Sequence, residues 1–434
     1  MEIVANLWEN SQTEMLRKKI VVSHSGKQHS YHLAKALLDL GRLQGFYTSS
    51  YLSPHWLQNL VLKSGNQFFS RRFKEGLGSP FVHSHWHFEL AEFFTRKLQG
   101  KSRSVQDLVY RRDVQFDEMM ARKLPSLDAA VFWGFQGSCH ASLEAAKQNG
   151  KTAVCELATA HVVQARKILA EEVRFQPEWA DSMDNLYFPP AYEKRLEEEP
   201  HRADVVISAS DFTSFTLRES GIAEEKIFKL PLGFDTSGIP FSEADHGFSS
   251  RPLRLLYAGT VTQRKGISYL LDAAETWSRN QDIELHVVGG IQGSGRAFGA
   301  RKHLCHYQPS VSQAELFRMY TEYDALILPT VFEGFGLVIV EAMAAGLPVI
   351  STPHSMAPDV VEDGKNGWII PIRDPKAIAD RVADLRNLDD ESYRNMRRNA
   401  RMAAMNFTWD NFTLRLEKLL SEKLDPPIIQ QQKP

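Results

Sequence analysis

Residues 333–350 read E-G-F-G-L-V-I-V-E-A-M-A-A-G-L-P-V-I and carry more information than any other segment of the chain. The run Leu337–Ala345 predicts a helix that is apolar nearly all round and therefore buried. Gly346 and Pro348 predict the end of that helix, by the usual glycine-then-proline stop. Glu341 is the only charged residue between positions 334 and 350, so this carboxylate has no obvious partner in its own segment.

The isolation of Glu341 is itself a prediction about binding. Desolvating an unpaired carboxylate costs several kcal/mol. A ligand rich in hydroxyl groups would offset that cost, and Glu333 would offer the same ligand a second carboxylate. The alternative interpretation is a core helix in which a structural Lys or Arg pairs with Glu341.

The residues before the helix complete the predicted site. Gly334 and Gly336 allow the backbone to approach a ligand closely. The N–H groups of Phe335, Gly336 and Leu337 would point outward at a helix N-terminus, where anions are favoured. A nucleoside diphosphate sugar fits this pattern, with its diphosphate on the amides, its sugar hydroxyls on the first carboxylate and its ribose hydroxyls on the second.

Residues 333–341 in their apolar context resemble the E-x7-E motif of the retaining GT-B glycosyltransferases of family GT4. The resemblance covers about residues 19–425 and is strongest over 203–235 and 253–370. It implies two Rossmann-like doubly wound domains facing across a cleft. It also implies transfer of a sugar, with retention, from a UDP- or GDP-type donor to a hydroxyl of a glycan, a lipid-linked acceptor or a small molecule. The donor is a substrate, so no cofactor is predicted. No protein nucleophile is identified, because in this family the departing phosphate can take the acceptor proton.

The order of elements favours an α/β fold, since short apolar strands alternate with amphipathic helices. The linker Pro231–Pro252 is rich in Gly, Ser, Pro and Asp, and it separates predicted domains at 1–240 and 241–406. A final helix over 407–425, with Thr408 as its N-cap, returns to the N-terminal domain in GT-B proteins. The predicted strands are Lys19–Ser23, Ala129–Trp133, Thr152–Glu156, Val205–Ser208, Leu253–Ala258, Leu285–Val288, Ala325–Leu328, Val349–Ser351 and Gly367–Ile370.

Lys265 lies at the turn between the strand Leu253–Ala258 and a helix, directly before a glycine. A cation there can hold a diphosphate as negative charge develops on it during bond cleavage. In the resembled family an Arg and a Lys of this segment contact the diphosphate. Lys265 matches the Lys, Thr260 occupies the Arg position, and Arg264 is the candidate replacement. A surface Arg-Lys pair is the alternative, but cations at a helix start oppose its dipole.

Two candidates lie in the N-terminal half. His161 shortly follows the strand Thr152–Glu156, and its place resembles that of the active-site His beside the transferred sugar in GT4 proteins. The alternative is a histidine of the core or of a helix. Gly26 lies in the loop after the first strand and would let this loop reach the acceptor or the phosphates. The loop lacks G-x-G-x-x-G, which argues against a dinucleotide-dependent oxidoreductase.

Composition narrows the partners. The chain has 434 residues and a net charge of −2, so the total charge indicates no nucleic-acid partner. Its three cysteines show no CxxC spacing, which favours free thiols in a reducing compartment. The H-x-H-x-H pattern at residues 83–87 lacks a supporting set of carboxylates, so no metal is predicted. No membrane-spanning run or signal-peptide core is recognised, and the expected location is cytoplasmic.

Residues 68–74 combine basic and aromatic side chains. They predict either a peripheral contact with the inner membrane, as in GT-B enzymes with lipid acceptors, or a solvated helix with one packed face. The departure at Thr260 supports a second hypothesis for the whole protein: a catalytically silent GT-B scaffold that binds a nucleotide or a partner protein.

Overall fold

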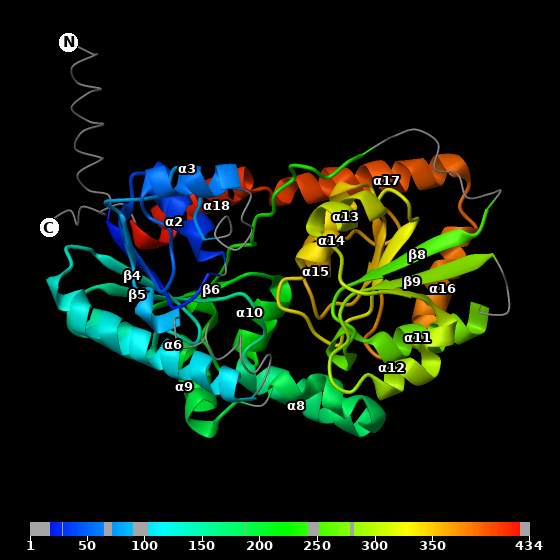
Figure 1. The fold of residues 1–434 in the computed structure, drawn as a ribbon, viewed down its shortest axis with the longest axis horizontal. Helices are drawn as coiled ribbons and strands as arrows, with labels where there is room; N and C mark the ends of the chain where they lie inside the picture. Colours follow the sequence, from blue (N-terminus) through cyan, green and yellow to red (C-terminus); the bar gives the residue numbers. More distant parts are fainter. Residues whose placement is uncertain are drawn as a thin grey trace, which may run out of the picture.

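The computed structural model describes residues 18–27, 29–64, 72–89, 103–186, 188–241, 251–277 and 282–425. Two sheets, each parallel throughout, lie beside one another with helices on both faces (Figure 1). The first sheet has the order β3-β2-β1-β4-β5-β6-β7 and the second the order β10-β9-β8-β11-β12-β13. This arrangement is the α/β architecture that the alternating pattern predicts.

The nine predicted strands are all present, each within two residues of its predicted bounds. Four strands were not predicted, and three of them (β3, β7 and β10) are three-residue strands at the edges of the sheets, too short to show a periodicity. The strands are β1 (Ile20–His24), β2 (Leu43–Thr48), β3 (Val82–Ser84), β4 (Val131–Phe135), β5 (Thr152–Leu157), β6 (Val205–Ser208), β7 (Ile227–Lys229), β8 (Leu253–Ala258), β9 (Ile283–Val288), β10 (His306–Gln308), β11 (Ala325–Leu328), β12 (Val349–Ser351) and β13 (Gly367–Ile369).

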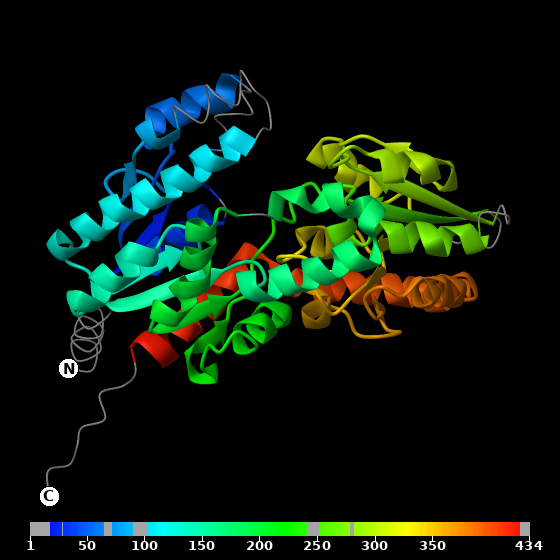
Figure 2. The ribbon, with the colours of Figure 1, turned by 90° about the horizontal axis from the view of Figure 1, so that it is seen from below.

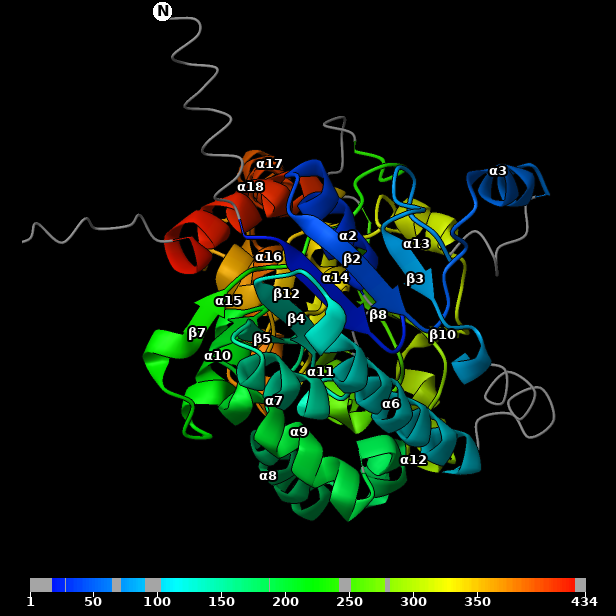
Figure 3. The same cartoon turned by 90° about the vertical axis from the view of Figure 1, so that its left-hand side faces the viewer.

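Helices cover each sheet on both sides, so the central strands are buried on both faces and consist mostly of apolar residues. Figure 3 shows α2 and α18 on one face of the first sheet and α6 and α7 on the other. The principal helices are α2 (Ser30–Asp39), α3 (His55–Ser64), α6 (Arg103–Lys123), α7 (His140–Gln148), α8 (Val162–Phe175), α9 (Pro190–Arg202), α10 (Asp211–Arg218), α11 (Ile267–Trp277), α12 (Arg296–Arg301), α13 (Gln313–Met319), α14 (Leu337–Ala344), α15 (Ala357–Val360), α16 (Pro375–Arg386), α17 (Asp390–Ala404) and α18 (Trp409–Leu419).

The last two helices connect the domains. Helix α17 packs on α14 of the second domain, and α18 packs on α2 of the first. The Thr408 hydroxyl accepts a hydrogen bond from the amide of Asn411, which confirms the predicted N-cap of α18. Phe412 and Leu416 enter the core of the first domain, and Trp409 stacks on His32 with 3.7 Å between ring centroids.

A second connection runs in the opposite direction. Figure 2 shows α8 extending from the first domain toward the second. The 3-10 helix η2 (Pro177–Leu186) follows α8 and contacts η4 (Gln263–Lys265), the turn after β8. Trp179 of η2 is buried in the core of the second domain. Residues 162–186 therefore precede the linker in sequence but pack on the domain that follows it.

Each sheet has one point where the strand order reverses, and ligands of open parallel sheets bind there, beyond the carboxyl ends of the strands. In the first sheet this point lies between β1 and β4, and in the second between β8 and β11. The loop that follows β8 holds Lys265, and the loop that follows β11 leads to Glu333. The topology thus places two distant predicted residues side by side.

Candidate active site

A cavity of about 390 Å³ lies at the carboxyl ends of β8 and β11. Its lining includes Lys265, Glu333 and Glu341, three of the residues predicted from the sequence. Ala158 of the first domain and Leu232 of the linker also line it. The cavity is therefore bounded by both halves of the chain, as a cleft between two facing domains requires.

Glu333 is held by two cations. One carboxylate oxygen lies 2.7 Å from Lys265 Nζ, and the other lies 2.9 Å from Arg264 Nη1. Burial by itself raises the pKa of Glu333, but Lys265 and Arg264 lower it to about 2. The carboxylate is therefore ionised at neutral pH, and both cations of the turn converge on it. Arg264, the candidate replacement for the missing arginine, reaches the site, whereas Thr260 is exposed.

Glycines bring the turn close to the neighbouring strands. Gly259 has φ 146°, and a Cβ atom there would lie 3.0 Å from Lys265 Nζ. Gly266 has φ 70°, and a Cβ atom would lie 1.9 Å from the carbonyl oxygen of Pro329, which follows β11. Side chains at these positions would push the turn away from the cavity, so the glycines fix where Lys265 lies.

The predicted anion site precedes α14. Gly336 is left-handed, with φ 84°, and α14 begins at the next residue. Within the part of the chain that the structure describes, the amides of Phe335, Gly336 and Leu337 have no acceptor. All three residues line the cavity. A Cβ atom on Gly334 would lie 2.9 Å from the carbonyl oxygen of Ala158, so this glycine allows the two domains to touch.

Glu341 differs from the expectation of a fully buried, unpartnered carboxylate. It is half-buried and lines the cavity. The phenolic oxygen of Tyr320, at the end of α13, lies 3.4 Å from the Glu341 carboxylate. Burial raises the pKa of Glu341, and hydrogen bonds from Tyr320 and Gln313 lower it. No local pattern predicts these two partners, because they come from a helix more than twenty residues away in the sequence. No Lys or Arg pairs with Glu341 within the described residues.

His161 is not among the residues that line the cavity, and its contact with the donor sugar stays a prediction. Its side chain is completely buried, its Nε2 lies 3.4 Å from the carbonyl oxygen of Glu197 in α9, and burial lowers its pKa. Ala158, three residues earlier, is the residue of this loop that reaches the cavity.

Gly26 lies at the carboxyl end of β1, outside the lining of the cavity. Its amide donates to His24 Nδ1 at 2.7 Å, and its carbonyl accepts from the Thr48 hydroxyl at 3.1 Å. The role of Gly26 toward an acceptor or a phosphate stays a prediction.

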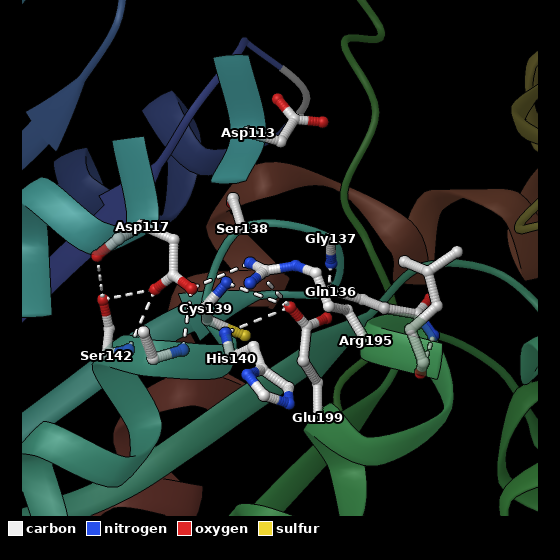
Figure 4. A network of polar contacts seen from close by, with 12 residues as sticks. Asp113, Asp117, Gln136, Gly137, Ser138, Cys139, His140, Ser142, Arg195 and Glu199 are labelled. Atoms are coloured by element: carbon white, nitrogen blue, oxygen red, sulfur yellow. Dashed lines mark hydrogen bonds and ion pairs between the residues drawn. The ribbon is translucent and has the colours of Figure 1, made fainter. Parts of the chain in front are cut away.

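A network of buried carboxylates surrounds the N-terminus of α7, the helix that follows β4 in the first domain (Figure 4). Glu199 of α9 accepts hydrogen bonds from the backbone amides of Gly137, Cys139 and His140. Asp117 of α6 accepts hydrogen bonds from the next two amides, those of Ala141 and Ser142. Arg195 pairs with Asp117 at 2.8 Å. Burial raises the pKa of Glu199 to about 8, against the lowering effect of the amides and Arg195. These carboxylates already occupy the N-terminus of α7, so this helix end is closed to a ligand.

Of the basic and aromatic segment at 68–74, residues 68–71 lie outside the described part of the chain. Arg72 pairs with Glu89 at 2.7 Å, and Phe73 packs against the core of the first domain. Among the helices that are described, none has the length and apolar character that crossing a bilayer requires.

Comparison with known proteins identifies the class. Residues 239–403 match the family model described as glycosyl transferases group 1. The O-antigen chain mannosyltransferase B of Escherichia coli is 28% identical over 237 residues, which are 51% of this chain and 61% of that protein. The chain therefore spans less than two thirds of the length of this curated relative.

Two solved structures share the fold over nearly the whole chain. Sucrose-phosphate synthase from Thermosynechococcus elongatus has a TM-score of 0.64 at 18% identity and covers 94% of this chain and 100% of its own. HepE of Anabaena, in complex with UDP and glucose, has a TM-score of 0.60 at 15% identity, with 93% and 100% covered. The GT-B fold predicted from the sequence is thereby confirmed, and residues 239–403 resemble the glycosyl transferases group 1.

Proposed function

We propose that the protein is a retaining glycosyltransferase that moves a sugar from a nucleoside diphosphate sugar, of UDP or GDP type, to a hydroxyl acceptor. One observation carries this proposal: Glu341, Lys265 of the β8 turn and the unpaired amides before α14 all line one cavity. The relationship to an O-antigen mannosyltransferase and the shared fold with a UDP-bound protein support the same class of reaction.

The diphosphate lies, in this proposal, on the amides of Phe335, Gly336 and Leu337 beside Lys265. Negative charge grows on the leaving diphosphate as the glycosidic bond breaks, and fixed donors in a site shielded from water stabilise that charge most effectively. Glu341 accepts hydrogen bonds from the ribose hydroxyls.

Glu333 orients the donor sugar through the sugar's hydroxyls. It also holds Lys265 and Arg264 in place before a donor arrives. The departing phosphate takes the acceptor proton on the same face of the sugar, so the anomeric configuration is retained without a protein nucleophile.

The acceptor approaches from the first domain, and a lipid-linked acceptor is consistent with the surface of α3. Trp56 and Leu60, one turn apart on this helix, are 71% and 58% exposed. An exposed Trp and Leu on one helix face suit the interface of a bilayer. We therefore place the protein in the cytoplasm, with peripheral contact at the inner membrane.

A panel of UDP, GDP and ADP sugars tests the donor. One nucleotide type should raise the midpoint of thermal unfolding, with a stabilisation of about 2.7 kcal/mol at one hundred times its Kd. Incubation with acceptors should then release the matching nucleoside diphosphate, and NMR of the product should show the anomeric configuration of the donor.

Each outcome has a distinct meaning. Stabilisation by a nucleoside diphosphate with no sugar transfer to any acceptor supports the silent scaffold instead. Inversion of the anomeric carbon contradicts the retaining mechanism. An unchanged unfolding midpoint with every nucleotide contradicts the donor site as a whole.

A further inference from the structure

A buried carboxylate of the first domain contacts the turn of the second domain that carries Lys265. Glu172 of α8 is completely buried, and one of its oxygens accepts hydrogen bonds from Gln263 at 2.7 Å and from the Tyr269 hydroxyl at 2.8 Å. Its other oxygen pairs with Arg373 at 2.7 Å. All three partners belong to the second domain, so the carboxylate is satisfied across the domain boundary.

The partner Gln263 belongs to the turn that holds the two cations. Its side chain is fully buried, and besides Glu172 it bonds Ser268 of α11: its Nε2 donates to the Ser268 hydroxyl, and its Oε1 accepts from the Ser268 amide. Arg264 and Lys265 follow directly in sequence. The hydrogen bond from Gln263 to Glu172 therefore fixes the backbone from which both cations reach Glu333.

Arg373 makes further contacts with helix α8 besides its ion pair with Glu172. Its guanidinium also donates to the carbonyl oxygen of Ile168, pairs with Glu171 at 3.3 Å and lies over the Phe175 ring at 4.9 Å. Arg373 has φ 62°, the only left-handed non-glycine residue among those described. A side chain tolerates this conformation only where the surroundings over-determine it. The strain therefore marks Arg373 as a residue held for its contact with α8.

The 3-10 helix η2 continues this contact along the donor site. The carbonyl oxygen of Ser182 accepts from the hydroxyl of Thr262, and the hydroxyl of Ser182 accepts from the amide of Gln263. The carboxylate of Asp181 accepts from the amide of Ser294 in the loop after β9. Residues 162–186 therefore support two adjacent loops of the second domain, the loop after β8 and the loop after β9.

We propose that Glu172 is a positioning residue of the donor site. From the first domain, it holds the diphosphate-binding turn Gln263–Lys265 of the second domain in place. The inference rests on the proposed function, because the turn is assigned to the diphosphate there. Residues 162–186 follow closely after the loop of Ala158, which lines the cavity. One continuous segment of the first domain therefore contacts both the cavity and the turn Gln263–Lys265. Loss of the carboxylate lets the turn shift and moves Lys265 away from the diphosphate.

The test compares Glu172→Gln with the wild-type protein in binding the favoured nucleoside diphosphate, UDP or GDP, and its monophosphate. The monophosphate depends less on the cations of the turn, so its affinity should stay unchanged. The preference for the diphosphate should fall about tenfold, the size of one lost charge-assisted interaction. Amide hydrogen exchange at residues 262–266 should become at least about tenfold faster, since the turn opens more often.

Glu171→Gln is the matched control, because Glu171 is the adjacent carboxylate on α8 and pairs with Arg373 but does not contact the turn. It should change neither readout. Tyr269→Phe removes one hydrogen bond to Glu172 and keeps the ring, so it tests the same network if Glu172→Gln folds poorly. It should lower the diphosphate preference in the same direction by a smaller factor.

The outcomes separate the two proposals. A wild-type protein that shows no preference for the diphosphate contradicts the proposed function and this inference with it. A wild-type preference that persists unchanged in Glu172→Gln and Tyr269→Phe, even with a lower unfolding midpoint, overturns this inference alone and leaves the function standing.

Discussion

At the scale of single residues, the two glutamates of the E-x7-E segment have opposite electrostatic surroundings. Glu333 faces Lys265 and Arg264, which lower its pKa to about 2. Within the described ranges, the donors that meet Glu341 are the neutral Tyr320 and Gln313, and burial raises its pKa. Both carboxylates line the same cavity, so one is already compensated by protein cations while the other still lacks a strong donor. This difference assigns them separate tasks toward a donor.

Replacing Glu341 with Gln should weaken nucleoside diphosphate binding about tenfold, because a carboxylate accepts hydroxyl hydrogen bonds more strongly than an amide. Isothermal titration calorimetry measures the change. Glu362→Gln is the control, since Glu362 is exposed, pairs with Lys365 at 2.7 Å and lies outside the cavity lining. Wild-type affinity in Glu341→Gln would rule out its contact with the ribose.

Glu333 makes stability depend on pH at the acidic end. Its folded-state pKa of about 2 lies below its ordinary value of 4.5, so its contribution is present above 4.5 and is lost as the pH falls toward 2. That contribution is at most about 3 kcal/mol. Urea unfolding of the wild-type protein and of Glu333→Gln should therefore differ at pH 6 and converge near pH 2. A difference that stays constant over this range would contradict the ion pairs.

At the scale of elements, α7 and α18 show how helix ends and faces hold the first domain. The N-terminus of α7 is satisfied by two buried carboxylates from other helices instead of by a local cap (Figure 4). Helix α18 has a local cap and buries one apolar face on the first domain. Both elements depend on contacts that are distant in sequence.

Asp117→Ala should lower the free energy of unfolding by about 3 kcal/mol or more, because Arg195 loses the closer of its two carboxylate partners and the amides of Ala141 and Ser142 lose their acceptor. Urea denaturation measures this loss. Glu144→Ala on the half-exposed face of α7 is the control and should change little. Nucleoside diphosphate affinity of the folded protein should not change, since Asp117 lies outside the cavity lining.

Phe412→Ala in α18 should cost about 3 to 5 kcal/mol, because the ring is completely buried in the first domain and its removal leaves a cavity. Leu414→Ala, two residues along the same helix, is the matched control because Leu414 is 63% exposed. Equal losses of stability in the two variants would show that α18 does not dock through this face.

At the scale of the whole molecule, the connections between the domains include three of different kinds. Residues 162–186 pack on the second domain, α18 packs on the first, and Lys229 of β7 pairs with Asp359 of α15 at 2.7 Å. The first and third involve buried carboxylates, Glu172 and Asp359, whose partners lie in the opposite half of the chain. Separating the domains would leave these charges without partners.

The two domains should therefore unfold together, in one heat-absorption peak with coincident fluorescence and circular dichroism transitions. Lys229→Met combined with Glu172→Gln should separate the transitions, because the two ion pairs of buried carboxylates across the boundary, Lys229–Asp359 and Arg373–Glu172, are lost. Lys376→Met, which removes only a surface pair within α16, is the control and should keep a single peak. Two resolved peaks in the wild-type protein would mean that the connections are weak.

The fold and part of the site followed from local pattern alone. Strands such as β6, β8, β11 and β12 were predicted at their observed bounds because buried parallel strands are continuous apolar runs. Lys265 and Glu333 could be predicted because each follows such a strand, and the residues at the carboxyl ends of adjacent strands must meet. The cap at Thr408 has a purely local cause as well.

Only the tertiary structure decided what each side chain faces. The direction of His161 depends on α9, the partners of Glu341 come from α13, and Glu172 meets its partners from 91 to 201 residues farther along the chain. No periodicity encodes such contacts, because they depend on how separate layers pack. The sequence by itself therefore determined the class of fold and the turn chemistry of the donor site, while packing determined which carboxylates and cations meet in it.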